Sequence, residues 1–431
     1  MTTEFPVVET LEYTCPGDSH PISRATHLSR LATFFPACRE CVHRDDTGGL
    51  AATTLDRLVR TQHRVARPTL FTDEGVRGVH RNELTRGDAD RLAAALAWLC
   101  WQDRPRRLGD DPGTRSSPVV VVGHDTRPAA RDLLAGVLAG LVRSGCRALE
   151  IGSVSDACFR FAVDHLQADA GIRVTGDGHP ESWIGLDAVS AKGRPLSRNA
   201  GLEAWEHAAD NGHPRPTRIA GHRRAFQATE VYEATLRRHL LASRPLAICL
   251  LAPEGTQRDS LERLLEPLAW NLLGHEASDT PSSRRHKRVA ELTRQHRADV
   301  GIAWDHDRDR AWFCDETGTP IDPLRLFVLL ATRILALFPG RTVVLATACA
   351  ERLASTIRQL GGRPRSFAGS SRASTWQAIH DHDAVLGLDP LGSTWCSEHA
   401  PTHDPLLVVA HLLQTLDRHD RPLSQLLARS D

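Results

Sequence analysis

The chain has 431 residues, of which 41% are hydrophobic and 25% are charged, and its formal net charge is zero. This length exceeds one ordinary hydrophobic core and predicts about two to four globular domains. A net charge of zero gives no bias toward nucleic acid or membranes as partners. Because no apolar run could span a bilayer and the N-terminus lacks a signal peptide, we expect a cytoplasmic protein. Its ten cysteines are then expected to be reduced thiols.

Residues 1–66 form a small helical extension that contains cysteine and histidine side chains. Cys38 and Cys41 make a C-x₂-C pair, and His43 follows two residues later. Together with Cys15 they make a Cys₃His set of the kind that holds Zn²⁺. The single pair and the long gap after Cys15 leave two alternatives open, an iron–sulfur site and ordinary reduced cysteines in a helical hairpin.

From residue 67 onward, short apolar strands alternate with helical stretches. A β-branched run at 118–125 predicts a buried strand, and it is followed by a helix at 129–144 and a strand at 148–151. This spacing predicts parallel strands in an α/β layer. Further strands are expected at 170–174, 246–251, 300–304, 311–314, 342–345 and 384–388, and further helices at 86–101, 155–166, 231–241, 261–272, 289–296, 324–337, 349–359 and 406–416. The basic run 283–288 is expected to be a solvated loop.

Three aspartates lie in the tight loop between the strands expected at 300–304 and 311–314. Asp305, Asp307 and Asp309 occupy alternating positions in this loop. Carboxylates this close repel one another unless a cation lies between them. Oxygen ligands without a neighbouring cysteine favour Mg²⁺ over softer metals. The alternative is a solvated acidic turn whose arginines pair locally.

Four loops, in chain order, resemble those of the α-D-phosphohexomutase family, the phosphoglucomutases and phosphomannomutases. Residues 71–78 resemble the family's Gly-Ile-Arg-Gly signature, and residues 119–128 resemble its Val-Gly-Arg-Asp-Thr-Arg-Pro segment. Residues 175–180 correspond to its Thr-Ala-Ser-His-Asn-Pro loop, and residues 305–310 to its Asp-Gly-Asp-Gly-Asp-Arg metal loop. Each motif alone is weak, but four in this order favour the family's fold.

This resemblance implies an α/β protein with three consecutive phosphohexomutase-type α/β/α domains behind the Cys/His extension. Domain I is expected at 67–200, domain II with the aspartate loop at 201–320, and domain III at 321–431. The family's fourth domain carries an Arg-x-Ser-Gly-Thr phosphate loop, and nothing after Leu406 resembles it. We therefore expect domain IV to be absent.

The resemblance also implies a chemistry. In the family, a phosphoserine gives its phosphoryl group to a sugar phosphate, and Mg²⁺ held by three aspartates neutralises that group. Asp305, Asp307 and Asp309 would be the Mg²⁺ ligands here. Arg77 and Arg127 would lie near the phosphoryl carrier and help to neutralise it. For Arg127, a purely structural ion pair with Asp125 is the alternative.

The phosphoserine loop departs from the family's sequence. Thr175-Gly-Asp-Gly-His-Pro180 places Asp177 where the serine belongs and His179 where the asparagine belongs. Asp177 could mimic phosphoserine, give the metal a fourth oxygen or form an acyl phosphate. Alternatively, catalysis has been lost and Asp177 is a polar loop residue. His179 is a candidate proton carrier, or a loop histidine that is neither acid nor base.

The sugar-binding loop of the family, Gly-Glu-x-Ser-Gly-His, corresponds to residues 387–393. Asp389 replaces the glutamate and Gly392 is retained, while Leu391 and Ser393 stand at the serine and histidine positions. Asp389 and Gly392 are therefore the candidate substrate-binding residues. Recognition of sugar hydroxyls is expected to be weakened or altered.

Two classes of function follow from these observations. The first is a divergent phosphohexomutase that binds Mg²⁺ and a phosphorylated hexose or similar small molecule, with the phosphoserine reaction lost or altered. If active, it would be an intramolecular phosphotransferase. The second is a non-catalytic regulatory or scaffold protein whose Cys/His extension docks a partner. No nucleic acid or membrane partner is expected, and an oligomer or a partner protein remains open.

Overall fold

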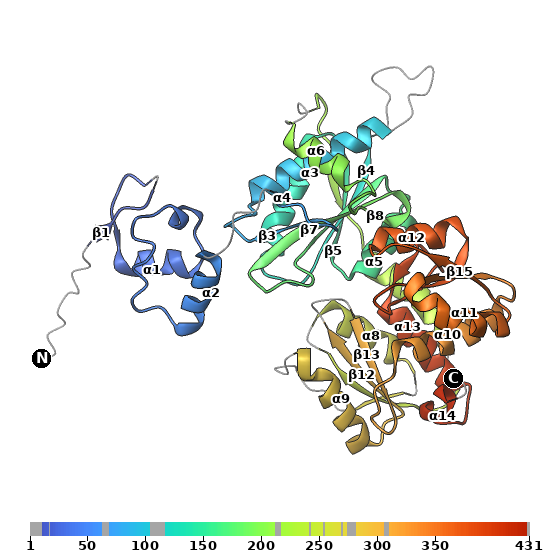
Figure 1. Ribbon diagram of the computed structural model, residues 1–431. Helices are drawn as coiled ribbons and strands as arrows, with labels where there is room; N and C mark the ends of the chain where they lie inside the picture. The colour runs from blue at the N-terminus through green and yellow to red at the C-terminus, as the bar shows by residue number, and fades with distance from the viewer. Residues whose placement is uncertain are drawn as a thin grey trace, which may run out of the picture.

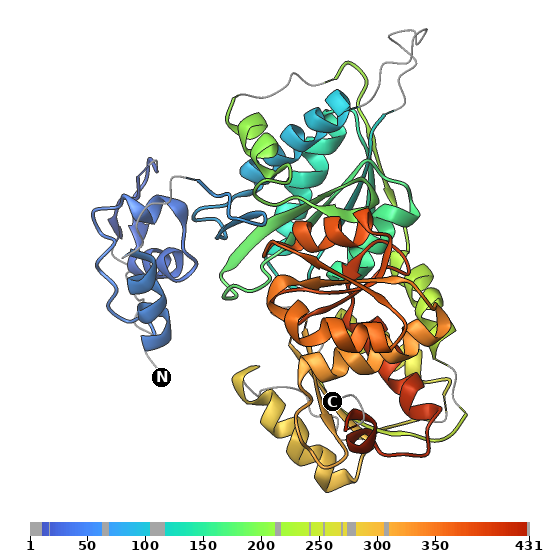
Figure 2. The ribbon, with the colours of Figure 1, turned by 45° about the vertical axis from the view of Figure 1, so that its right-hand side comes forward.

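The computed structural model describes most of the chain. It covers residues 11–16, 18–62, 69–103, 117–211, 217–240, 243–252, 255–268, 270–273, 282–305 and 310–428. A small N-terminal unit lies apart from three larger sheet-containing units in both ribbon views (Figures 1 and 2). Among the described residues, no helix is both long and apolar enough to cross a membrane.

The N-terminal unit is built on a very small core. Its elements are β1 (Leu11–Tyr13), β2 (Ile22–Ser23), α1 (Arg24–Ala32), the 3₁₀ helix η1 (Pro36–Arg39) and α2 (Ala52–Gln62). The Ser23 hydroxyl caps α1 by accepting a hydrogen bond from the Thr26 N–H at 3.3 Å. The buried core consists of Leu31, Cys38 and Leu58. The predicted helical extension is confirmed, with one short β-hairpin added.

The first large unit is a seven-stranded sheet with helices on both faces. Its elements are β3 (Val76–Val79), α3 (Arg86–Asp103), β4 (Val119–His124), α4 (Ala130–Arg143), β5 (Arg147–Ser153), α5 (Asp156–His165), β6 (Ala170–Thr175), β7 (Trp183–Ser190), η2 (Ala191–Gly193), β8 (Arg194–Pro195), α6 (Leu202–Asp210) and β9 (His222–Ala225). The strand order is β3-β7-β6-β4-β5-β9, and β8 pairs with β7. As predicted, β4 is parallel to β5 and β6.

Both faces of this sheet are buried, which explains the unbroken apolar run of β4. Val120 and Val122 pack against the cluster formed by α3, α4 and α6, whereas Val121 packs on the opposite face with Phe159 of α5. The approach of α5 to β6 is close: a Cβ added to Gly171 would lie 2.7 Å from the Phe159 ring. Gly171 therefore sets the distance between this helix and the sheet.

The second large unit is a four-stranded sheet in the order β11-β10-β12-β13. Its elements are α7 (Ala228–Leu236), η3 (Arg237–His239), β10 (Ala247–Leu251), α8 (Thr256–Leu265), β11 (Asn271–Leu273), α9 (Ser282–His296), β12 (Val300–Asp305) and β13 (Arg310–Asp315). The helix predicted at 261–272 was wrong in part, since α8 begins earlier and residues 271–273 form a strand. The two strands expected on either side of the aspartate loop are present as β12 and β13, and they pair antiparallel.

The basic run 283–288 is helical, so the predicted loop was wrong. α9 begins at Ser282, and the guanidinium of Arg285 donates to the Trp304 carbonyl at 3.2 Å. The run contains no glycine or proline, and arginine and lysine have good intrinsic helix propensity. It therefore extends the helix that was predicted to start at Val289.

The third large unit is a five-stranded sheet in the order β15-β14-β16-β17-β18. Its elements are α10 (Pro323–Leu337), β14 (Thr342–Ala346), α11 (Thr347–Gln359), β15 (Arg363–Phe367), α12 (Arg372–Asp381), β16 (Ala384–Leu388), β17 (Thr394–Cys396), β18 (Thr402–His403), α13 (Pro405–Asp417) and α14 (Leu423–Leu427). The mixed α/β class is confirmed, while the predicted domain boundaries remain predictions.

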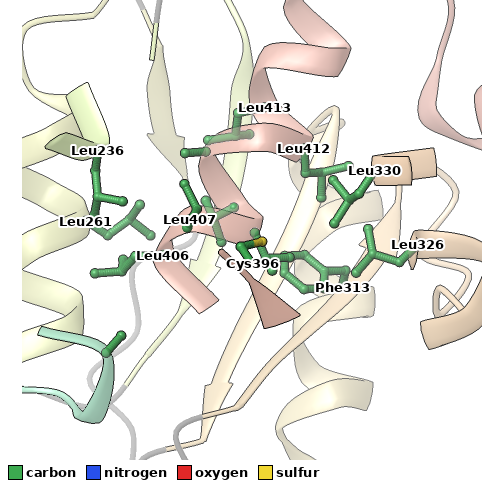
Figure 3. Close-up of a cluster of buried hydrophobic side chains, with 14 of the residues drawn as sticks. Leu236, Leu261, Phe313, Leu326, Leu330, Cys396, Leu406, Leu407, Leu412 and Leu413 are labelled. Atoms are coloured by element: carbon green, nitrogen blue, oxygen red, sulfur yellow. The ribbon is translucent and has the colours of Figure 1, made fainter. Parts of the chain in front are cut away.

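Helix α13 lies at the centre of the core that these units share. All of its residues are buried. Leu406 and Leu407 face Leu261 of α8, and Leu412 meets Leu330 of α10 (Figure 3). A helix that is apolar on all sides needs neighbours on all sides, so α13 holds the second and third units together.

We predict that Gly171→Ala destabilises the protein by about 1–3 kcal/mol, because the new methyl group overpacks the contact between β6 and α5. Denaturant unfolding measures the change. Gly87→Ala is the matched control: Gly87 is an exposed helical residue whose added Cβ meets only Thr85, at 3.6 Å. This control should be neutral or up to about 1 kcal/mol more stable. Equal stability of the two variants would contradict the close packing.

Candidate functional site

Loops from all three sheet-containing units meet around one cavity of about 410 Å³. They are the loop before β3, the loop after β6, the start of β13, the start of α12 and the loop between β16 and β17. The charged and imidazole side chains that line it are Glu74, Arg77, Asp177, His179, Asp187, Arg310, Arg372, Asp389 and His403. The cavity therefore brings together four residues that the sequence predicted as site residues: Arg77, Asp177, His179 and Asp389.

Asp125 and Arg127 hold the loop after β6 in place. The Asp125 carboxylate accepts hydrogen bonds from the N–H groups of Gly176, at 2.9 Å, and Arg127, at 3.0 Å. The Arg127 guanidinium donates to the carbonyl oxygens of His179 and Pro180, at 2.9 and 2.8 Å. It lies across Gly176 so closely that an added Cβ there would be 2.6 Å from the Arg127 Cζ. The structure thus gives Arg127 a clear positioning role, along with an ion pair to Asp125 at 3.5 Å.

Asp177 lies on the cavity wall, and its side chain is 22% exposed. Its carboxylate accepts a hydrogen bond from the Arg173 guanidinium at 2.6 Å. Arg173 is buried on β6 and also donates to the Val154 carbonyl at 3.3 Å. A buried guanidinium therefore supports the carboxylate at the position of the family's serine.

His179 is held against the same loop. Its ring stacks on Trp183 with the centroids 5.0 Å apart. Its Nδ1 donates to the backbone carbonyl of Asp177 at 2.9 Å. These contacts fix the imidazole at the edge of the cavity, and its role as a proton carrier stays a prediction.

Arg77 belongs to a buried ion cluster that the sequence did not reveal. Its guanidinium lies 2.6 Å from Asp187 of β7, and both side chains are nearly inaccessible. Arg372, at the start of α12, also contacts Asp187 at 3.2 Å and reaches Glu74 at 3.1 Å and Asp156 at 3.6 Å. This cluster fastens the third unit to the first across the floor of the cavity.

The charges in this cluster stabilise one another. Burial by itself would raise the pKa of the Asp187 carboxyl, but Arg77 and Arg372 hold it well below its usual range. Burial would likewise lower the pKa of Arg372, but Asp187, Asp156 and Glu74 raise it. Each group is therefore charged and paired, and no position in the family-like motifs pointed to Arg372.

The acidic loop borders the cavity at its C-terminal end. Asp305 is the last residue of β12 and pairs with Arg310, the first residue of β13, which lines the cavity. The Asp305 side chain, Asp307 and Asp309 lie outside the described residues. A donor set of three carboxylates suits a hard divalent cation such as Mg²⁺.

Asp389 shapes its own loop. One carboxylate oxygen accepts from the N–H groups of Leu391 and Ser393 at 2.9 and 2.8 Å, and the other accepts from the Trp395 indole N–H at 3.1 Å. Gly392 takes a left-handed conformation, with φ at 79°, which permits the turn. Both residues lie at the cavity or its rim, and sugar binding by them stays a prediction.

The predicted zinc ligands of the N-terminal unit lie away from this cavity. Cys15, Cys38 and Cys41 are buried thiols. Burial, together with the neighbouring Cys15 and Cys41, raises the pKa of Cys38 to about 11. The His43 ring meets Tyr13 edge-on at 5.2 Å. Within the part of the chain that the structure describes, these four side chains do not form a set whose ligand atoms all lie within 4.8 Å of one another.

Comparison with known proteins agrees with this geometry. Residues 68–213 match the family model for phosphoglucomutase/phosphomannomutase, alpha/beta/alpha domain I. A phosphohexose mutase of Xanthomonas campestris pv. campestris is 29% identical over 369 residues, which cover 81% of this chain and 78% of the relative. A phosphomannomutase/phosphoglucomutase of Pseudomonas aeruginosa is 25% identical over 367 residues, which cover 82% of this chain and 75% of the relative.

Solved structures share the fold. A phosphoglucomutase/phosphomannomutase family protein from Burkholderia thailandensis has a TM-score of 0.70 at 20% sequence identity, covering 83% of this chain and 78% of that one. A phosphomannomutase, described as putative, from Thermus thermophilus has a TM-score of 0.69 at 20% identity, covering 85% and 84%. At such identities the likeness establishes the fold alone. Together with the matched first domain, the mutase relatives show that the chain is similar to phosphohexomutases over about four fifths of its length.

Proposed function

We propose that this protein binds Mg²⁺ and a phosphorylated hexose in the cavity, and that it has lost the phosphoserine mutase reaction. The observation that carries the proposal is the ion pair between Asp177 and Arg173, 2.6 Å long, at the position of the family's phosphoserine. A carboxylate has no hydroxyl group that could carry a phosphoryl ester. A phosphoserine holds a charge of about −2 at neutral pH, and Asp177 supplies a smaller, permanent negative charge in its place.

The charges around the cavity explain why a metal ion would be needed for binding. Four carboxylates and three guanidiniums line it. A phosphate dianion would therefore meet an excess of negative charge. Asp305, Asp307 and Asp309 are the residues that would hold Mg²⁺, which supplies the positive charge that offsets phosphoryl oxygens. Arg310, next to this loop on the cavity wall, would add a second positive group.

The chain's own residues keep the cavity assembled. Asp125 and Arg127 fix the loop that presents Asp177, through its backbone rather than its side chains. The Arg372 cluster sets the separation between this loop and the loop of Asp389. A preformed cavity lowers the ordering cost of binding, which supports a binding function even without turnover.

We also propose that the N-terminal unit holds Zn²⁺ through Cys15, Cys38, Cys41 and His43. Among its described residues, the hydrophobic core cluster has only Leu31, Cys38 and Leu58 as buried members. A unit this small cannot bury enough apolar surface for independent stability and needs a metal or another cross-link. Three buried thiols in the same unit are suitable ligands, once deprotonated, and zinc binding would draw the four side chains closer together than the described structure has them.

The Mg²⁺ proposal predicts that Asp307→Asn weakens Mg²⁺ binding by at least roughly tenfold, because one of three anionic ligands is lost. Calorimetry of Mg²⁺ binding measures this. The same variant should lose Mg²⁺-dependent binding of glucose 1,6-bisphosphate. Asp210→Asn, an exposed site at the end of α6, is the control and should bind as the wild type does. Identical Mg²⁺ affinities for the two variants would rule out the aspartate loop as the site.

The loss of mutase activity predicts no conversion of glucose 1-phosphate to glucose 6-phosphate and no phosphoryl adduct on the wild-type protein. Intact mass after incubation with glucose 1,6-bisphosphate and Mg²⁺ detects such an adduct. Asp177→Ser restores a hydroxyl beside Arg173 and should gain one phosphoryl group, whereas Asp177→Ala should not. A wild-type adduct that disappears in Asp177→Ala would instead identify an aspartyl phosphate and an active enzyme.

The zinc proposal predicts about one Zn²⁺ per chain that is lost when Cys38 and Cys41 are both replaced by serine. Elemental analysis of purified protein gives the count. Cys349→Ser, at a buried thiol of α11, is the control and should keep its zinc. Iron in place of zinc would point to the iron–sulfur alternative. Equal zinc contents in the control and the double variant would contradict the proposal.

A further inference from the structure

Three metal-ligand side chains meet at the junction of the second and third units, away from the cavity. His239 ends η3, Glu398 lies in the loop after β17, and His411 is inside α13. The Nε2 atoms of the two histidines lie 2.6 and 2.8 Å from the two carboxylate oxygens of Glu398. One ligand atom from each residue falls within 4.8 Å of the others, and among the described residues this is the one set with that geometry.

We propose that His239, Glu398 and His411 bind one divalent transition-metal ion, with Zn²⁺ as the best-suited ion. Two imidazoles and one carboxylate form a donor set that proteins use for Zn²⁺, with water completing the tetrahedron. Mg²⁺ and Ca²⁺ prefer sites made of oxygen ligands alone. This proposal is independent of the function proposed for the cavity.

The ligand atoms would have to move to hold such an ion. Zinc–nitrogen bonds of about 2.0–2.1 Å place the ligand atoms of a tetrahedral site roughly 3.3 Å apart. The two nitrogen–oxygen distances of 2.6 and 2.8 Å would open by roughly half an ångström, and the widest spacing in the set, up to 4.8 Å, would close by roughly 1.5 Å. His411 is fixed by α13 and is only 2% exposed, whereas His239 and Glu398 are 23% and 28% exposed. These two can move, and their open side gives an ion and a water molecule access.

The protonation states also suit a metal ion. Burial lowers the pKa of His411, which favours the neutral imidazole. Burial alone would raise the pKa of Glu398, but its hydrogen bonds with His239 and His411 hold it well below the usual range. A carboxylate and neutral imidazoles are the forms that bind metals. Because the Nε2 atoms of both histidines now donate to Glu398, ligation through Nε2 would require each imidazole proton to shift to Nδ1.

Positive groups nearby limit the affinity. Arg333 of α10 faces Glu398 and His411, and its guanidinium donates to the Gln414 side chain. The exposed His399 lies next to the cluster, and its pKa is lowered by partial desolvation, by Arg238 and by His239, and raised by Glu398. The positive charges of Arg333 and Arg238 weaken metal binding relative to an isolated site of the same ligands. The negative charge of Glu398 offsets one of these two charges.

Metal binding would link the second and third units. η3 precedes the four-stranded sheet, whose hairpin carries the aspartate loop, and Glu398 lies between β17 and β18 of the sheet that carries Asp389. An ion at this junction would fasten the two units and fix the distance between the two loops. Metal binding should therefore raise the thermal stability of the protein. The ion itself would lie away from the cavity and would not contact a molecule bound there.

The test uses the full chain with Cys15, Cys38 and Cys41 replaced by serine, so that the N-terminal thiols cannot bind metal. After chelator treatment, we expect calorimetry to show one Zn²⁺ per chain and a Zn²⁺-dependent rise in Tm. Co²⁺ should give the visible bands of a tetrahedral site without a thiolate charge-transfer band. Glu398→Gln should weaken Zn²⁺ binding by more than roughly 100-fold, beyond the loss expected for an outer-sphere change.

His399→Asn is the matched control, because it removes an exposed histidine next to Glu398 that is not in the set. It should bind Zn²⁺ as the parent chain does. Glu398→Gln is the decisive variant, since its amide keeps the size of the side chain and hydrogen bonds to both histidines. Unchanged Zn²⁺ affinity in folded Glu398→Gln would overturn the proposal. So would the absence of Zn²⁺ binding in the folded serine-substituted chain, which would leave a hydrogen-bonded cluster without metal.

Discussion

The burial of α13 is the constraint on which the arrangement of the larger units depends. A helix buried at every position cannot be stable alone, because its apolar surface would face water on all sides. Its N-terminus is fixed by Asp404, whose carboxylate accepts hydrogen bonds from the Leu407 N–H and from the Tyr232 hydroxyl of α7. The last large helix thus completes the core of units formed much earlier in the chain, and their folding is coupled.

The ion cluster around Arg372 restricts how the units are oriented relative to one another. Apolar contacts tolerate small rotations of one unit against another, whereas an arginine fork between three carboxylates allows few orientations. Removing Arg372 would leave Asp187 buried with one partner instead of two, which is costly inside a protein. Hydrophobic burial therefore joins the units, and the ion cluster fixes how the loops around the cavity face one another.

Much of the fold could be predicted because its strands are apolar and bounded by turn residues. The apolar run of β4 and the glycine at 145, which ends α4, are examples of such local signals. β7 was missed because the charged Asp187 interrupts its apolar pattern. The partner that makes this charge tolerable, Arg372, is 185 residues away in sequence. The His239, Glu398 and His411 set could not be predicted either, since only the packing of α13 brings these residues together.

The loop around Gly176 limits which substitutions this part of the cavity can accept. A Cβ at residue 176 would lie 2.5 Å from the Trp183 carbonyl oxygen and 2.6 Å from the Arg127 Cζ. Even a methyl group there would therefore require the Arg127 side chain and the backbone at Trp183 to move. The same close contact that holds the loop in place restricts residue 176 to glycine.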